Sequence, residues 1–301
     1  MKYIDSEIIL QRKIGPLVYV YIMIIIVIML SLIILFIMCS YKTYNVVRGV
    51  VINEEGHYYI RIHMDIESMK YIIDNDTYKY LREKMSKYMY EDGYSTNGGF
   101  YTICNIYYDT DTDMLIRNSL DKPLYKEKLR LRSYGQAEPD TKVFLEIKKK
   151  YKGVVNKRRT VLKLSEAYKF LDTYEKPEIK EYMNGQVVNE LAYFMQLYKP
   201  VPKVFLAYDR AALFGKDDPE LRITFDTNIR TRRENLRLDS EVEGKQLLDK
   251  GCWLMEIKLA IGYPDWLLKL LEERNIRKQS FSKYGTEYKG YLKDNNFKVV
   301  K

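Results

Sequence analysis

The sequence has 301 residues and a formal net charge of +9 at neutral pH, with only three cysteines and two histidines. This basic balance predicts a polyanionic partner, such as a nucleotide, polyphosphate, nucleic acid or an acidic membrane surface. The cysteines show no CxxC or Cys/His spacing, which argues against zinc and against a disulfide framework. Both histidines, His57 and His63, precede the strand-rich region, which argues against a histidine-based triad there. No glycine-rich phosphate loop is found either.

The N-terminal part is dominated by an apolar run. After a short tail of residues 1–16, 23 residues from Leu17 to Cys39 carry no charge. As a helix this run would reach roughly 34 Å, enough for a hydrocarbon core of about 30 Å. We predict one transmembrane helix over residues 17–39; the alternative is a buried hydrophobic helix. Basic residues flank the run on both sides, so charge does not fix its orientation. Residues 40–65 are predicted to be a linker or an additional β segment.

A folded domain is predicted over residues 66–290, followed by a tail of residues 291–301. Its first elements are a strand over residues 68–72, a helix capped by Asp76, and a strand over residues 103–109. The helix is predicted from apolar residues at helical spacing, namely Tyr78, Leu81, Met85 and Met89.

The stretch from Tyr125 to Arg159 holds twelve Lys or Arg against four Asp or Glu, so nearly all of the basic excess lies there. Charged and apolar residues alternate along it, which predicts strands with one cationic and one apolar face. The cationic faces carry Lys126, Lys128, Arg130 and Arg132, then Glu146, Lys148 and Lys150, then Lys157 and Arg159. For a single strand, a solvated outer face would explain such a pattern. Because the pattern recurs in several strands of one domain, a solvated outer face does not explain it, and the cationic faces are expected to serve one common function.

The rest of the domain alternates helices and strands. Helices are predicted after Ser165, around Val187 to Tyr198, and from Pro264, whose apolar stripe is Trp266, Leu267, Leu270 and Leu271. Strands are predicted over residues 204–210, 221–230 and 253–259. In the second of these the polar face is Arg222, Thr224, Asp226, Asn228 and Arg230. Residues 282–285 are predicted as a loop or short strand. Asp109 and Asp226 are interpreted as residues that cap or order turns.

These elements predict an α+β fold, with a large antiparallel sheet or closed β-barrel and flanking helices. Because the helices carry apolar stripes, they would pack on the apolar strand faces and leave the charged faces inside. Burying so many charges is costly unless a ligand compensates them. The interior is therefore predicted to be a water-filled cationic tunnel that holds a polyanion.

Eight short motifs point to a known family. They are IYYDT (106–110), KEKLRLRSYG (126–135), FLEIKKK (144–150), VVNKRR (154–159), YDR (208–210), LRITFDTNI (221–229), MEIK (255–258) and SKYG (282–285). Together they resemble the VTC domain, the polyphosphate polymerase domain of the vacuolar transporter chaperone complex and its bacterial relatives, within the triphosphate tunnel metalloenzymes. The match covers roughly residues 67–289, in order.

The resemblance implies a tunnel-shaped antiparallel barrel. It would bind ATP and add the γ-phosphoryl group to a growing polyphosphate chain, with Mn²⁺ or Mg²⁺. Arg130, Arg132, Lys148, Lys157, Arg159 and Arg210 would line the phosphate site, and Tyr208 would offer a hydroxyl. Lys258 and Lys283 would contact the product chain, and Lys70 and Lys258 would join the two arginines at the nucleotide. Glu256 would bind the metal. Relatives often carry an acid at the position of Ser68, so metal binding here would depend on Glu256 and Glu146.

Two alternatives stay open: a triphosphate or polyphosphate hydrolase of the same fold, and a non-catalytic polyphosphate-binding membrane protein. A nucleic-acid partner is disfavoured because the cations alternate along strand faces and do not form an aromatic-interleaved platform. The predicted helix 17–39 would anchor the chain, with the domain in the ATP-containing cytoplasm and the N-terminus outside. Export of a polymer would then require oligomers or partner subunits.

Overall fold

The computed structural model describes residues 21, 23–31, 48–54, 57–63, 67–93, 99–121, 123–152, 154–259 and 262–295. The chain divides into two compact units, Met1–Met64 and Asp65–Lys301. Most of the predicted membrane segment 17–39, and the tail 1–16, lie outside the described residues. Those that are described, 21 and 23–31, are helical. Within the described part of the chain, no helix combines the length and the apolarity needed to cross a membrane.

The first unit contains a small antiparallel sheet within the segment predicted as a linker or β segment. Its strands are β1 (Arg48–Glu54) and β2 (His57–His63). They pair along their whole length, with Arg48 opposite His63 and Glu54 opposite His57.

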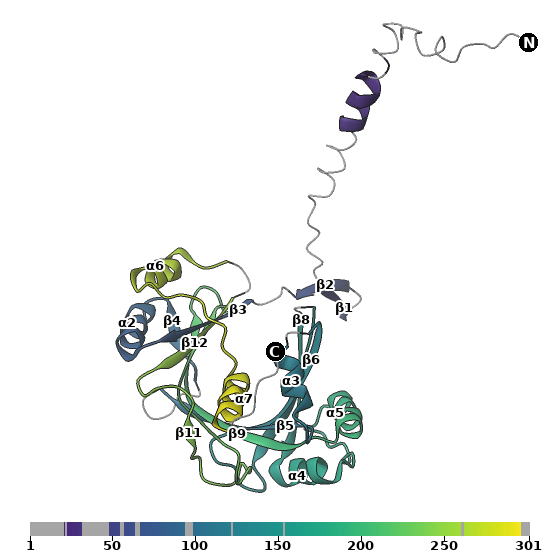
Figure 1. Cartoon of the computed structure of the whole chain (residues 1–301), viewed down its shortest axis with the longest axis vertical. Helices are drawn as coiled ribbons and strands as arrows, with labels where there is room; N and C mark the ends of the chain where they lie inside the picture. Colours follow the sequence, from purple (N-terminus) through teal and green to yellow (C-terminus); the bar gives the residue numbers. More distant parts are fainter. Residues whose placement is uncertain are drawn as a thin grey trace, which may run out of the picture. The chain divides into compact units, whose positions relative to one another are not determined.

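The second unit is built on one ten-stranded antiparallel sheet (Figure 1). Its main path runs β3-β12-β10-β9-β5-β6-β7-β8, while β11 pairs with β10 and β4 with β9. The strands are β3 (Glu67–Ile73), β4 (Met89–Glu91), β5 (Tyr101–Asp109), β6 (Tyr125–Tyr134), β7 (Lys142–Tyr151), β8 (Val154–Lys163), β9 (Val201–Gly215), β10 (Arg222–Arg232), β11 (Lys245–Gln246) and β12 (Trp253–Leu259). The sheet curves into a deep trough.

Helices cover both outer walls of this trough (Figure 1). The helices are α2 (Asn75–Met85), α3 (Met114–Leu120), α4 (Leu164–Thr173), α5 (Gly185–Tyr198), α6 (Asp265–Glu273) and α7 (Lys283–Asp294). On one wall, Leu129 and Leu145 of the basic strands pack with Phe170 of α4 and Leu191 of α5. On the other, residues of β3, β10 and β12 pack with those of α2 and α6. The predicted direction of the faces, apolar toward the helices and charged inward, is confirmed.

The inside of the trough is only partly polar. Helices α3 and α7 lie within it, where Ile116, Tyr284 and Tyr288 form a third apolar cluster with Leu206 and Leu254 of the sheet. Asp109 fixes the start of α3, because its carboxylate accepts hydrogen bonds from the backbone N–H groups of Leu115 and Ile116, at 2.8 Å each. The interpretation of Asp109 as a capping residue is therefore confirmed.

The prediction of a closed barrel is wrong. In the described residues β3 and β8 are the two ends of the sheet and do not pair with each other. The free edge of β3 is occupied instead by the segment between α6 and α7: the backbone N–H of Gln279 donates to the carbonyl oxygen of Lys70 at 2.8 Å. That segment takes the place where a closing strand would have to pair.

Two helix starts differ from the prediction. Asp74, not Asp76, caps α2, because an N-cap side chain must reach an N–H about three residues further on; Asp74 accepts from the backbone of Thr77 at 2.7 Å. The helix α4 begins one residue before Ser165, with its N-cap at Lys163. The helix predicted to continue to Met89 ends at Met85, and Met89 begins β4.

Two further predictions fail for reasons of backbone conformation. Residues 282–285 form the start of α7, with Ser282 as its N-cap, and not a loop or strand. In β10, Asn228 adopts a left-handed conformation with φ of 49° and creates a bulge, which shifts the register with β9 between Thr227 and Arg230. Arg222, Thr224 and Asp226 therefore share a face, but Arg230 does not: its guanidinium contacts Asp209.

Candidate active site

A cavity of about 310 Å³ lies on the concave face of the sheet, lined by eleven Lys or Arg side chains and two Glu side chains. All twelve residues predicted from the sequence to form the site line it: Lys70, Arg130, Arg132, Glu146, Lys148, Lys157, Arg159, Tyr208, Arg210, Glu256, Lys258 and Lys283. They come from six strands and the first turn of α7, because alternate residues of a strand point to the same face. The structure brings them together; their chemical roles stay predictions.

Glu146 organises the wall formed by the basic strands. It lies opposite Arg130 in β6 and opposite Arg159 in β8, and its side chain is 1% exposed. Its carboxylate accepts from Nε of Arg130 at 2.5 Å and lies 2.7 Å from Nζ of Lys157. Burial alone would raise the pKa of Glu146, but Arg130, Arg132 and Lys157 together lower it to about 2. The carboxylate therefore stays charged and holds Arg130 and Lys157 in place.

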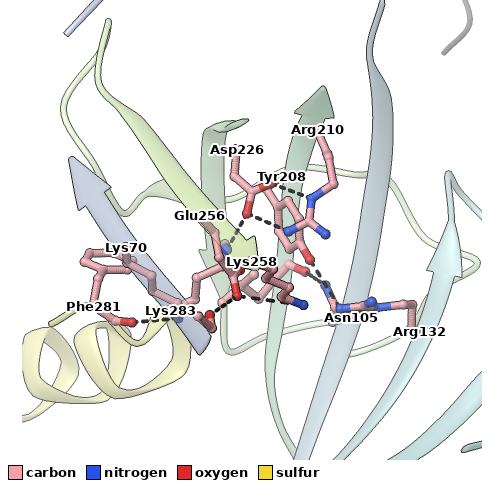
Figure 2. A network of polar contacts seen from close by, with 12 residues as sticks. Lys70, Asn105, Arg132, Tyr208, Arg210, Asp226, Glu256, Lys258, Phe281 and Lys283 are labelled. Carbon is pink, nitrogen blue, oxygen red and sulfur yellow. Dashed lines mark hydrogen bonds and ion pairs between the residues drawn. The ribbon is translucent and has the colours of Figure 1, made fainter. Parts of the chain in front are cut away.

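Asp226 organises the opposite wall, and it was not among the predicted site residues. Its fully buried carboxylate accepts two hydrogen bonds from Arg210, at 2.6 and 2.8 Å, and one from Nζ of Lys283 at 2.6 Å (Figure 2). Burial alone would raise the pKa of Asp226, but these two cations lower it well below its ordinary value. The interpretation that Asp226 orders a turn is wrong, because it lies within β10 and joins β9 to α7.

Arg132 and Tyr208 connect the two walls across the floor of the cavity. Nη2 of Arg132 lies 3.2 Å from the Tyr208 hydroxyl, and Nε donates to Oδ1 of Asn105 at 2.9 Å (Figure 2). The amide of Asn105 is itself fixed by the carbonyl oxygen of Leu206 at 3.0 Å. Burial alone would raise the pKa of Tyr208, but Arg132, Arg210 and Lys283 lower it. The guanidinium is thus oriented before any ligand binds.

Glu256 is the second carboxylate that faces the cavity. It accepts a hydrogen bond of 2.6 Å from Ser68, and it lies 3.9 Å from Nζ of Lys258. Lys70 is opposite Glu256 in the β3–β12 pair and donates to the carbonyl oxygen of Phe281 at 2.9 Å. Burial alone would raise the pKa of Glu256, but Lys258 and Lys70 lower it. The carboxylate of Glu256 is therefore ionised at neutral pH.

A divalent cation would fit this site if the protein and the bound phosphates shared its coordination. Among the described residues, no three His, Cys, Asp or Glu side chains come together as a metal site. Glu146 has its charge engaged by Arg130 and Lys157, whereas the Glu256 side chain is 17% exposed and faces the cavity. Mg²⁺ is commonly bound by one or two carboxylates together with substrate phosphates. Glu256 suits that mode.

Several lining residues were missed by sequence reasoning, among them Tyr107, Lys128, Arg222 and Tyr284. For Lys128 the signal was present, because it alternates with Arg130 and Arg132. Tyr107 and Tyr284 stack at 4.7 Å between β5 and α7, a contact between distant parts of the chain that no local pattern reveals.

A second cavity, of about 370 Å³, shares Lys128, Lys148 and Ser282 with the first. It lies between β6, β7 and the two inner helices α3 and α7, and it adds three further lysines, Lys126, Lys150 and Lys289. The cationic surface therefore extends beyond the main cavity along β6 and β7.

Two lysines that line the main cavity, Lys128 and Lys157, predict that its affinity for polyanions depends on pH. Burial lowers the pKa of Lys128 and Lys157 to about 8, so both lose positive charge as the pH rises through that value. Arginine keeps its charge over this range. We therefore expect the affinity of the wild type for tripolyphosphate, relative to that of Lys128→Arg, to fall by about fivefold or more between pH 7 and pH 9. Calorimetric titration of both proteins measures this, and the ligand's own titration cancels in the ratio. A constant ratio would contradict the prediction.

Comparison with known proteins identifies the family. The family model for the VTC domain matches residues 65–291. No curated protein matches the chain significantly. Among solved structures, a candidate adenylate cyclase from Bacillus halodurans is 15% identical, with a TM-score of 0.44 over 73% of this chain and 96% of that one. A Hippeastrum protein with a dominant triphosphatase activity is 16% identical, with a TM-score of 0.45 over 75% and 96%. A Pyrococcus horikoshii protein is 12% identical, with a TM-score of 0.38 over 75% and 99%.

These structural similarities are too distant to assign an activity. The family match is different in kind, because it covers most of the chain and includes every strand that lines the cavity. It confirms the resemblance inferred from the eight motifs: the chain belongs to the VTC domain family.

Proposed function

We propose that this chain is an ATP-dependent polyphosphate polymerase, which transfers the γ-phosphoryl group of ATP to the end of a polyphosphate chain. The observation that supports this most is the cavity itself, in which eleven Lys or Arg and two Glu side chains surround about 310 Å³. Without a ligand, so many like charges would repel one another in a partly buried space. A chain of phosphates supplies the compensating negative charge along its whole length.

Phosphoryl transfer depends mainly on positioning and on stabilising charge in the transition state. The planar guanidinium of arginine suits phosphate oxygens, and Arg130, Arg132 and Arg210 are each held by a buried partner before substrate binds. The terminal phosphate of the acceptor chain is already anionic, so its attack needs no general base. The position of both histidines outside this unit, in β2, is consistent with such a reaction.

Within this proposal the two carboxylates have different roles. Glu256 would hold a divalent cation, Mn²⁺ or Mg²⁺, which would help neutralise the phosphate oxygens. Glu146 is a positioning residue for Arg130 and Lys157, because both of those cations already contact its carboxylate. Lys258, Lys283 and Lys148 supply point charges for the product chain. Lys70 faces Glu256 across the β3–β12 pair and would add a further positive charge beside the metal.

The proposal includes a membrane location. The uncharged run from Leu17 to Cys39 supports an anchor at the membrane, and the use of ATP supports a cytoplasmic position for the catalytic unit. A single anchor cannot form a passage for a polymer, so export would involve oligomers or partner subunits.

Incubating the purified full-length chain with ATP and Mn²⁺ should yield long polyphosphate, detected by gel electrophoresis. The chain offers a matched pair of variants in adjacent residues. Arg159 lines the cavity, while Arg158 lies on the other face of β8 and pairs with Glu190 at 3.3 Å. Arg159→Ala should reduce polymer yield strongly, and Arg158→Ala should leave it unchanged.

Other products would support the alternatives. Release of free phosphate from tripolyphosphate, without polymer, would identify a hydrolase. Tight binding of polyphosphate without turnover, in protein that also binds ATP and Mn²⁺, would identify a non-catalytic binder. Either result would replace the polymerase proposal.

A further inference from the structure

One end of the main cavity is aromatic. We call Tyr101, Tyr134 and Phe144 the aromatic rim; Tyr101 and Tyr134 line the cavity directly. The rings of Tyr101 and Tyr134 have centroids 5.9 Å apart, and Phe144 packs edge-on against Tyr134 at 5.8 Å and 89°. Phe144 is in turn covered by the guanidinium of Arg159, 4.9 Å from its centroid. The ring of Tyr134 is therefore held in place by packing against Tyr101 and Phe144.

The aromatic rim lies at one end of a row of side chains that changes from cationic to aromatic. Along β6 the residues that line the cavity are Lys128, Arg130, Arg132 and Tyr134, in that order. The neighbouring strand β7 shows the same change, since Lys148 is opposite Lys128 and Phe144 is opposite Arg132. At about 3.4 Å per residue, Tyr134 is roughly 20 Å from Lys128 along the strand. The second, lysine-lined cavity joins at the Lys128 end.

This change from cationic to aromatic side chains matches the two parts of a nucleoside triphosphate. Its phosphates need cations, which the middle of the cavity supplies. Its base is a flat uncharged ring that gains nothing from lysines but stacks on an aromatic face. Exposed tyrosines at strand ends are common on protein surfaces. Tyr134 differs because it is 50% exposed and yet lines the cationic cavity, beside a second tyrosine.

We propose that the aromatic rim binds the nucleoside of the ATP that donates phosphate, with the base stacked on Tyr134. This inference rests on the proposed function and adds a direction to it. The phosphates of ATP extend from Tyr134 past Arg132 and Arg130, and the product chain leaves toward Lys128 and the second cavity. The rim thus distinguishes a nucleotide from a bare phosphate chain, which the cations alone do not.

The test compares two ligands that share phosphates and differ in the nucleoside. In Tyr134→Ala of the full-length chain, we expect the affinity for ATP to fall about tenfold or more, while the affinity for tripolyphosphate changes less than twofold. Tyr134→Phe keeps the ring and should retain wild-type affinity for both ligands. Tyr151→Ala is the matched control, because Tyr151 is 51% exposed at the far end of β7. Calorimetric titration in one buffer with Mn²⁺ measures all four proteins.

Retained tripolyphosphate binding also shows that the variant is folded. If Tyr134→Ala bound ATP as tightly as the wild type, or lost ATP and tripolyphosphate equally, the assignment of the nucleoside to the rim would be overturned. The result is independent of turnover: a wild type that binds ATP through Tyr134 but makes no polymer would contradict the proposed function and leave the rim intact.

Discussion

Replacing Glu256 with glutamine is expected to lower polymer synthesis at least about 100-fold while leaving tripolyphosphate bound. Glutamine has nearly the same size, and its amide oxygen can still accept the hydrogen bond from Ser68, so the packing of β12 against β3 should persist. What is lost is the negative charge that would hold the metal among the phosphates. Turnover with ATP, measured over a range of Mn²⁺ concentrations, tests this directly.

A control with the same chemical change is Glu138→Gln, since Glu138 is exposed in the turn after β6. It should behave as the wild type. Binding of tripolyphosphate to Glu256→Gln should be at least as tight as to the wild type, because removing an acid from a cationic cavity reduces repulsion of the ligand. Wild-type turnover in Glu256→Gln would place the metal ligand elsewhere.

The second large effect is expected on stability, from Asp226→Ala. The change would leave Arg210 and Lys283 buried without their shared partner, with side chains only 14% and 12% exposed. Removing one member of a buried ion pair typically costs about 3–5 kcal/mol. We expect the free energy of unfolding, measured by urea denaturation, to fall by that amount. Turnover should also fall, because Arg210 and Lys283 line the cavity.

The chain contains a matched exposed pair for comparison. Asp239 accepts two hydrogen bonds from Arg237, at 2.9 and 2.7 Å, in the same two-pronged geometry, but Arg237 is 54% exposed. Asp239→Ala should cost only about 0–1 kcal/mol. Equal losses in Asp226→Ala and Asp239→Ala would show that burial does not strengthen the Asp226 cluster.

The stability that Asp226 contributes through Arg210 and Lys283 is lost only at low pH. Burial alone would raise the pKa of Asp226, but Arg210 and Lys283 lower it below its ordinary value. A carboxyl whose pKa is lowered by folding contributes its full stability above its unfolded pKa, about 3.9 for aspartate. That contribution is lost only as the pH falls further, through the lowered pKa of the folded state.

The cationic faces of the basic strands could be predicted because a strand has a period of two. The alternation of Arg130 and Arg132 with Leu129 and Leu131 defines one polar and one apolar face, whatever the rest of the chain does. The apolar stripes of the helices need an apolar surface to pack on, and the apolar faces of the strands supply it. The cationic faces are therefore left inside the sheet. This reasoning needs no long-range information. Lys70, Glu256 and Lys283 were predicted from the family resemblance instead, and the structure places them in the same cavity as the cationic faces.

The errors arose where partners are distant or the backbone is irregular. Asp226 is joined to Lys283, 57 residues further on, and no local pattern marks such a pairing. The left-handed conformation of Asn228 breaks an otherwise regular alternation, and asparagine also occurs in ordinary strands. Closure of the sheet depends on whether β3 meets β8, and at the β3 edge the backbone of Gln279 hydrogen-bonds to Lys70 instead. These are features of tertiary structure.

Under the proposed function, the open sheet would affect how a long product is retained. In a closed bore, a polymer could escape only by sliding out end first. In the described part of this chain β3 and β8 do not pair, so no closed ring of hydrogen-bonded strands would confine a bound polymer. Processivity would then be set by electrostatic retention and not by threading. Since salt screens such attraction, the ionic strength of the surroundings would govern how many phosphates are added in each encounter.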